Sequence, residues 1–321
     1  MNNFKKIGLT ALAGSLVATS VYAGEMSVAG SASWRISNHA GTDGGKTMAM
    51  GNQLTFTGGG EMDNGMNVSL SFILDQGDNA TTSTANASAK LAEAPFDSHS
   101  ITVSSDAMGS ITFAGEGASS AQNTLDTTAA GDIWDNTFAS YTQPTNADAN
   151  KVLTWTLPSV MDGLGVTTSY NFSSAAKEAT IGYALTYTGV EGLSVSYGFG
   201  EVGGNTAGTT GAEVTTMKAS FAFGPITAAM SINDYDITGA SNEEQSSYKI
   251  SYSVSDELSV SYGSETHETT GQSTDEEFDQ VSVSYTTGGL TASVSQTNAD
   301  NVTDATLTEQ TKWNVGLSFA F

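Results

Sequence analysis

Residues that could act as catalysts are few in this chain of 321 residues, which has no cysteine and three histidines. The run Asp97-Ser98-His99 contains the residue types of a hydrolytic triad. Neighbouring residues of a strand point to opposite faces, so these three side chains could not form a hydrogen-bonded relay. His39 and His267 fall in expected loops without obvious partners and read as ordinary surface residues. We therefore expect no catalytic residues and no enzymatic activity.

Two groups of oxygen-bearing side chains could bind a metal ion. Asp75, Asp78 and Asn79 form one group, and Asp132 with Asp135 forms the other. Neither group has the regular spacing of an EF-hand calcium loop, and segments rich in Asp, Asn and Gly are usually plain loops. We expect no metal site and no cofactor, and loop-bound calcium stays an open alternative.

The chain as a whole is strongly acidic, with 34 acidic and 10 basic residues and a net charge of −24. Such a surface repels nucleic acid and anionic lipid and attracts cations. Nucleic acid is therefore excluded as a partner. Because cysteine is absent, hydrogen bonding and packing must hold the fold together without disulfides.

The first residues have the pattern of a secretory signal peptide. Lys5 and Lys6 precede an apolar stretch that runs to about Ala18, and small residues around Ala23 suit cleavage before Gly24. The apolar stretch is shorter than the ~20 residues of a membrane-spanning helix. Removing the two lysines leaves 34 acidic and 8 basic residues, a net charge of −26.

Beyond the signal peptide, apolar and polar residues alternate with the period of two that is typical of β-strands. In the last segment, Trp313, Val315, Leu317, Phe319 and Phe321 share one face. We count about 16 such segments, mostly near the ~10 residues of a tilted membrane-spanning strand.

The connections between these segments alternate between short and long. The short ones hold turn-forming residues and lie at 61–64, 106–108, 159–163, 189–192, 224–225, 256–257 and 287–289. The long ones lie near 37–49, 75–97, 116–150, 173–177, 200–211, 233–243, 265–275 and 298–308. An antiparallel barrel with turns at one end and loops at the other has this rhythm, and the strand number must be even when both chain ends lie on the turn side.

The apolar faces decide between a water-soluble and a membrane barrel. Large side chains such as Trp34, Phe72 and Tyr262 would be an aggregation hazard in water but are required in lipid, where only helices and closed barrels satisfy their backbone. We predict an all-β fold: a transmembrane antiparallel β-barrel with short periplasmic turns and long extracellular loops. Residues 1–23 are the cleaved signal peptide and 24–321 the barrel, with no room for an N-terminal plug domain.

In this pattern the chain resembles the Gram-negative general porins, especially their alphaproteobacterial branch. Two features carry the resemblance: the alternating last strand that ends at Phe321, and the longest loop, 116–150, after the strand 109–115. The resemblance implies a bacterial outer-membrane location and a homotrimer that passes ions and small hydrophilic solutes. It also implies contacts with outer-membrane lipid and lipopolysaccharide, recognition of Phe321 by the barrel assembly machinery, and an inward fold of loop 116–150 that narrows the pore.

In a passive pore, the sign and position of charges in the lumen set the ion selectivity. The candidate acidic constriction loop carries Glu116, Asp126, Asp132, Asp135 and Asp148. The basic residues that strand parity points inward are Arg35, Lys218, Lys249 and Lys312. Arg35 and Lys312 lie on the first and last strands and are expected to be neighbours where the barrel closes. An acidic loop opposite a basic wall predicts a preference for cations.

Simpler interpretations of the acidic loop residues and of the inward basic residues remain open. Lysines must face the lumen because the lipid face would cost a few kcal/mol, and any exposed loop of so acidic a chain would be acidic. Three further functions also remain: a channel specific for one nutrient, a surface adhesin or structural barrel, and a barrel-borne hydrolase. A specific channel would show solute-dependent block of its conductance, and an adhesin would conduct poorly.

Overall fold

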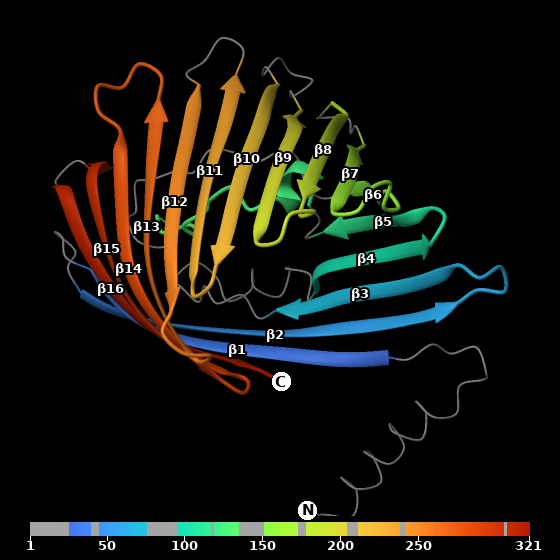
Figure 1. Ribbon diagram of the computed structural model, residues 1–321, viewed down its shortest axis with the longest axis horizontal. Helices are drawn as coiled ribbons and strands as arrows, with labels where there is room; N and C mark the ends of the chain where they lie inside the picture. Colours follow the sequence, from blue (N-terminus) through green and yellow to red (C-terminus); the bar gives the residue numbers. More distant parts are fainter. Residues whose placement is uncertain are drawn as a thin grey trace, which may run out of the picture.

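The described part of the computed structural model forms one closed barrel of 16 antiparallel strands (Figure 1). The structure describes residues 26–39, 45–75, 96–116, 119–134, 151–172, 178–203, 211–237, 242–304 and 307–321. The strands are β1 (Met26–His39), β2 (Gly45–Glu61), β3 (Asn67–Asp75), β4 (Phe96–Ser105), β5 (Gly109–Glu116), β6 (Val152–Thr156), β7 (Leu164–Asn171), β8 (Thr180–Tyr187), β9 (Leu193–Val202), β10 (Ala212–Phe223), β11 (Ile226–Ile237), β12 (Glu243–Ser253), β13 (Leu258–Thr269), β14 (Glu276–Thr287), β15 (Leu290–Asp304) and β16 (Leu307–Ala320). The predicted fold and strand number are confirmed.

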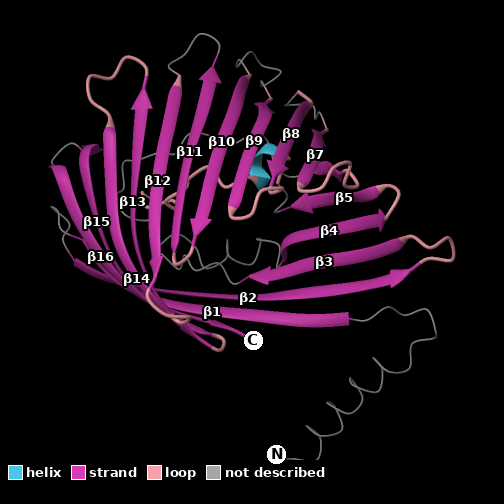
Figure 2. Cartoon of the chain, viewed as in Figure 1, coloured by secondary structure: helices cyan, strands magenta, loops and turns pink. Residues whose placement is uncertain are grey.

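Almost all of the regular structure is strand, coloured magenta in Figure 2. The exception among the described residues is η1, a 3₁₀ turn at Gln122–Thr124, drawn in cyan. Within the same residues, no helix is long and apolar enough to cross a membrane.

The two faces of each strand differ as the alternation predicts. On β10, Met217 and Phe221 are about half exposed on the outer surface, whereas Thr216, the residue before Met217, is fully buried on the opposite face. Large apolar side chains stay exposed in the same way along most strands. In a closed barrel this apolar outer surface is the face that meets lipid.

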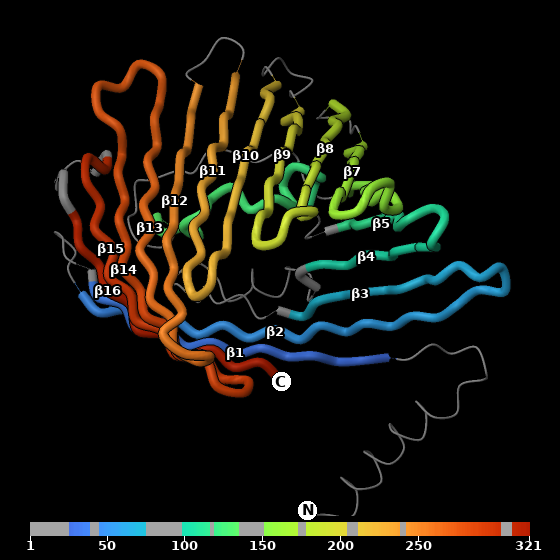
Figure 3. The backbone as a smooth tube through the Cα atoms, viewed as in Figure 1, coloured from blue at the N-terminus to red at the C-terminus, as the bar shows by residue number. Residues whose placement is uncertain are grey.

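Tight turns join the strands at one end of the barrel, as Figure 3 shows for the hairpin of β10 and β11. Gly224 and Pro225 make that turn, and Gly224 has a φ of +57°, a left-handed conformation that glycine adopts without strain. Each short connection predicted from the sequence overlaps a gap between two observed strands, and two of them begin one residue early, at the last residues of β2 and β14, Glu61 and Thr287.

Several predicted loops are shorter than expected because the strands extend into them. The loop expected at 37–49 shrinks to residues 40–44, and the one at 298–308 to 305–306. Strand ends that rise out of the lipid carry polar residues on both faces, so their sequence loses the alternation that marks a strand. His267, expected in a loop, lies for the same reason on β13.

The barrel closes where β1 pairs with β16. The last bonds of this seam join Gly30 and Phe321, whose backbone N–H groups each donate to the other's carbonyl, at 2.7 and 2.9 Å. The Phe321 ring lies over Gly30, where a Cβ atom would collide with it. The C-terminal residue is thus the final partner of the first strand.

Candidate functional site

The segment 119–134, which follows β5, lies against the inner face of the barrel. Its backbone or side chains hydrogen-bond to Ser169 on β7, Ser231 on β11 and Ser247 on β12, and further contacts reach β6, β8, β9, β10 and β13. Only the inner face of a closed barrel brings so many strands within reach of one segment. We call residues 119–134 the inner segment.

Serine hydroxyls on the wall accept backbone N–H groups of the inner segment. Ala129 N donates to Ser231 Oγ and Ala130 N to Ser247 Oγ, both at 2.8 Å. Ser231 and Ser247 are opposite each other in the register of β11 and β12, so one register row of the wall offers two acceptors to two successive residues. Buried backbone donors need such partners because an unpaired one is costly.

A similar contact anchors η1, through a side chain of the segment. Gln122 donates from Nε2 to Thr216 Oγ1 at 2.8 Å, and Thr216 donates in turn to Asn233 Oδ1 at 2.6 Å. All three side chains are fully buried. The chain of bonds runs from the inner segment across β10 to β11, so it ties the segment to two strands.

Glycines on the wall let the inner segment approach closely. A Cβ atom at Gly198 on β9 would lie 2.8 Å from Leu125 Cδ1, and one at Gly263 on β13 would lie 2.9 Å from Ala130 Cβ. Real Cβ atoms essentially never come so near. Glycine at these two positions therefore makes room for the segment.

Glu265 on β13 accepts two hydrogen bonds from the end of the segment. Ile133 N donates to Oε1 at 3.2 Å and Trp134 N to Oε2 at 3.4 Å. The side chain is only 1% exposed, so these bonds replace water around a buried carboxyl group.

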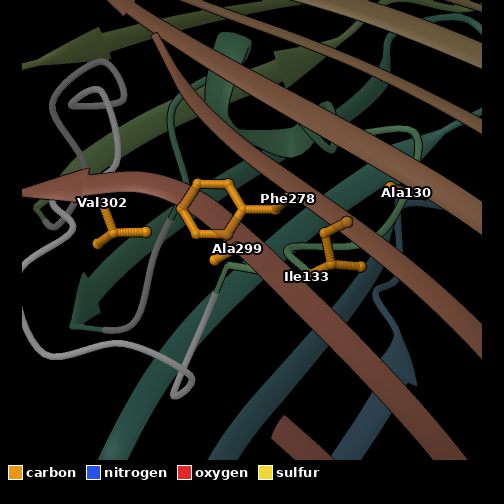
Figure 4. Close-up of a cluster of buried hydrophobic side chains, with 5 residues drawn as sticks. All are labelled: Ala130, Ile133, Phe278, Ala299 and Val302. Atoms are coloured by element: carbon orange, nitrogen blue, oxygen red, sulfur yellow. The ribbon is translucent and has the colours of Figure 1, made fainter. Parts of the chain in front are cut away.

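Apolar side chains complete the attachment at the same place. Figure 4 shows the Phe278 ring of β14 between Val302 and Ile133, with Ala299 of β15 beside it. Trp134 packs against this cluster. This cluster is the one buried hydrophobic cluster among the described residues. The inner segment contributes Ala130 and Ile133 to it.

The predicted acidic residues within the inner segment have different surroundings. Asp126 pairs with Lys218 of β10, whose Nζ lies 2.5 Å from Oδ2 and also donates to the Thr128 carbonyl at 3.1 Å. Asp132 instead closes a local turn with Thr128, whose hydroxyl donates to Oδ1 at 2.9 Å, and it is exposed. Asp126 is thus opposed by a positive charge at contact distance, and Asp132 is held within its own segment.

The other three predicted acidic residues lie outside the inner segment. Glu116 is the last residue of β5, at the start of the long connection. Asp135 and Asp148 lie outside the described residues.

Two of the four predicted basic residues lie directly against the inner segment. Lys218 and Lys249 touch the inner segment: Lys249 Nζ donates to the Ala130 carbonyl at 3.3 Å. The inner segment thus packs on the strands that carry these two lysines.

Arg35 and Lys312 lie on paired strands, as expected, but not next to each other. The register sets Arg35 opposite Gly316 and Lys312 opposite His39. Four residues of strand separate the two positions, roughly 13 Å at 3.3–3.4 Å per residue. Lys312 is buried, whereas Arg35 lines a depression of about 320 Å³ among small residues such as Ala49 and Gly51.

His267 is not the surface residue that the sequence suggested. It is 7% exposed, with Nδ1 3.3 Å from Glu276 Oε2 and Nε2 3.9 Å from Glu243 Oε2. These partners come from neighbouring strands, which a linear sequence does not reveal. No group of three or more His, Cys, Asp or Glu in the described ranges is arranged to hold a metal ion. The candidate calcium groups include residues outside those ranges.

The residues that hold the inner segment were missed in the sequence. Ser231, Ser247 and Glu265 stand at inward positions of the alternation, where serine is common and carries no special signal. Glu265 was assigned to a loop. The signal that could have identified Glu265 is its position: when the alternation of β13 is continued past the predicted end of the strand, this acidic residue falls on the inward face.

Comparisons with known proteins agree with this geometry. The family model described as "Gram-negative porin" matches residues 8–321. Among solved structures, OmpF of Salmonella typhi, solved with daunomycin, has a TM-score of 0.68 at 13% identity and covers 93% of this chain and 98% of its own. An anion-selective porin from Comamonas acidovorans has a TM-score of 0.66 at 12% identity and covers 93% and 100%.

A third structure is OmpT of Vibrio cholerae in its trimer form, with a TM-score of 0.64 at 12% identity and coverage of 93% and 100%. At these identities the likeness shows a shared fold. Among curated proteins, none matches this chain.

Proposed function

Since the chain belongs to the Gram-negative porin family, we propose that it is an outer-membrane diffusion channel that passes ions and small hydrophilic solutes and prefers cations. The family and the 16-strand barrel support the location and the channel. Porins are channel proteins and not enzymes. Cation preference goes beyond this support. The porin from Comamonas acidovorans has a similar fold and is anion-selective, so the selectivity of this chain has to be measured.

The observation that carries the cation preference is the engagement of the wall lysines. The ammonium group of Lys218 is paired with Asp126, and that of Lys249 is directed to the Ala130 carbonyl. The Asp126 carboxylate cancels most of the field that Lys218 projects into the water beside it, and the Ala130 carbonyl dipole reduces the field of Lys249 only in part. The chain as a whole keeps its large negative charge.

Arg35 and Asp132 are the charged side chains that we expect to act on passing ions. Asp132 is exposed on the inner segment, and Arg35 lines a depression on β1, away from the strands that carry the segment. A cation can approach the carboxylate on one side while the guanidinium repels it from the other. We infer a modest cation preference, set by a transverse field and not by a fully acidic ring.

Three further parts of the proposal follow from the family resemblance. We propose a homotrimer, by analogy with the trimeric OmpT of Vibrio cholerae. We also propose removal of residues 1–23 as a signal peptide, and recognition of Phe321 by the barrel assembly machinery. The alphaproteobacterial branch stays a prediction.

The test is the zero-current potential of the purified porin in a planar bilayer under a potassium chloride gradient, compared with that of Asp126→Asn. The substitution leaves Lys218 without its carboxylate, so the lumen gains one positive charge. A unit charge at 4 Å in water is worth about 1 kcal/mol, which changes the local cation concentration by roughly fivefold before screening.

We expect a potential that favours potassium in the wild type and a smaller one in Asp126→Asn. Asp106→Asn, in the turn between β4 and β5, removes the same charge away from the inner segment and should have little effect. A wild-type potential that favours chloride would reject the proposed selectivity. Absence of any conductance would reject the channel itself.

A further inference from the structure

Arg35 lines a depression of about 320 Å³ on the inner face of β1, β2, β15 and β16. Its neighbours in the register are Ala49 on β2 and Gly316 on β16, whose small size leaves room on both sides of the guanidinium group. Arg35 is half-buried, and all other residues that line the depression are uncharged. In the described part of the chain, no carboxylate lies within ion-pair distance of it. The guanidinium group thus has N–H donors available for a solute in the lumen.

Serine hydroxyls lie around this guanidinium group. Ser293 on β15 is in the same register row, beyond Gly316. A Cβ atom at Gly316 would lie 3.1 Å from Ser293 Oγ, so this hydroxyl lies over the glycine, on the side of Arg35. Ser33 and Ser318 are opposite each other in the next inward row, are exposed and line the same depression. The depression therefore combines one cation with several hydroxyl groups.

The register row of Arg35 continues into further serines on the wall. From Gly316 it passes through Ser293 on β15, Ser284 on β14, Ser259 on β13 and Ser253 on β12. A serine hydroxyl both donates and accepts hydrogen bonds, as the alcohol groups of a hydrophilic solute do. Neighbouring strands are about 4.7–4.9 Å apart, so these side chains form a regular series that begins beside the guanidinium group. A solute held at Arg35 by an anionic end can meet hydroxyl groups with the rest of its length.

The guanidinium group in this setting favours a carboxylate over a phosphate. Its planar fork matches a carboxylate through two parallel hydrogen bonds. A phosphate monoester carries a charge of about −1.5 to −2 at pH 7, and one guanidinium group neutralises only part of it. The remainder would meet the field of a chain with a net charge of −24. A singly charged acid with several alcohol groups therefore suits both the cation and the serines.

We propose that the Arg35 depression binds the carboxylate of small polyhydroxy acids, such as sugar acids, with their alcohol groups on Ser293, Ser33 and Ser318. The proposal rests on the proposed channel function and adds a class of solute to it. An acid that stays at this site obstructs the lumen, so it should block the ion current while it is bound. Conductance in potassium chloride alone reports the channel, and the block reports the site, so failure of one is distinguishable from failure of the other.

The test is the conductance of the purified porin in a planar bilayer when gluconate, glucose or acetate is added to potassium chloride at constant ionic strength. Gluconate has the carboxylate and the alcohol groups, glucose lacks the carboxylate, and acetate lacks the alcohol groups. We expect gluconate to block at concentrations roughly fivefold or more below those needed for the other two. Equal effects of gluconate and acetate, or of gluconate and glucose, would overturn the proposal, and so would the absence of any block by gluconate.

Substitutions separate recognition by the guanidinium group from attraction by its charge. Arg35→Gln should weaken the block by gluconate roughly tenfold or more, and its conductance in potassium chloride shows that it is folded. Arg35→Lys keeps the charge without the planar fork and should weaken the block roughly threefold. The matched control is Lys46→Gln, which removes the same charge from the outward face of β2, beside exposed Met48, and should be blocked as the wild type is.

Two results with these variants would contradict the proposal. If Lys46→Gln loses as much block as Arg35→Gln does, the acid responds to the net charge of the protein and not to the depression. If Arg35→Lys loses none, the positive charge alone attracts the acid and the carboxylate is not recognised by the guanidinium group.

Discussion

Replacing Ser231 and Ser247 together by valine should release the middle of the inner segment from the wall. Their hydroxyls accept the Ala129 and Ala130 N–H groups at 2.8 Å, and both serines are buried. Valine offers no acceptor, and its extra methyl group fills the space that a replacing water would need. A buried donor left unpaired costs about 1–3 kcal/mol, so the pair costs about 2–6 kcal/mol.

The remaining attachments of the same stretch are of similar strength. Lys218 bonds to the Thr128 carbonyl and Lys249 to the Ala130 carbonyl. Hydrogen bonds that involve a charged group contribute about 1.5–3 kcal/mol each. The free energy lost with the two serine hydrogen bonds is therefore comparable with that of the two remaining lysine hydrogen bonds. The segment should consequently occupy displaced positions for a measurable part of the time.

Single-channel recording in a planar bilayer measures this displacement directly. We expect a changed mean conductance and a noisier open level in the double valine variant, and a smaller effect in the double alanine variant, which leaves room for water. Ser251→Val, on the inner face of β12 without a hydrogen bond to the segment in the structure, is the matched control. Wild-type conductance and noise in the double valine variant would show that these two bonds do not position the segment.

Three further substitutions test the fold around the site. Gly263→Leu should shift the inner segment, because a side chain there meets Ala130, and the conductance should change while the barrel stays folded by circular dichroism. Glu265→Ala removes the acceptor of two hydrogen bonds at the end of the segment, each of which contributes about 0.5–1.5 kcal/mol; protease cleavage within the segment should become faster, and an unchanged rate would argue against this role. Gly30→Val should displace the Phe321 ring from the closing seam and lower the temperature at which the barrel unfolds on a gel, with unaltered heat stability as the contrary result.

The membrane barrel could be predicted because lipid imposes a rule on every strand. A side chain such as Phe221 must face outward and its neighbours inward, so the fold leaves a period of two along most of the chain. The rule stops where strands rise above the lipid. The end of β1, Ser37-Asn38-His39, is polar on both faces, and there the predicted boundary was wrong.

The site was less predictable because its contacts join residues far apart in the sequence. Strand parity placed Lys218 and Lys249 inward, but it contains no information about what lies against them. Their partners, Asp126 and the Ala130 carbonyl, are 92 and 119 residues away. Serines that accept backbone donors have no distinctive neighbours, so only the packed structure distinguishes Ser231 from other inward serines.

The attachment of the inner segment also limits which charges can control ion passage. Serine hydroxyls hold the segment without adding charge, Lys218 and Asp126 oppose each other at contact distance, and Glu265 is buried against backbone donors. Charges used in this way have little field left for a passing ion, because an opposite partner close by cancels most of it at a distance. Asp132 is exposed on the inner segment and Arg35 lines a depression on β1, so we expect the balance between these two charges to govern the proposed cation preference.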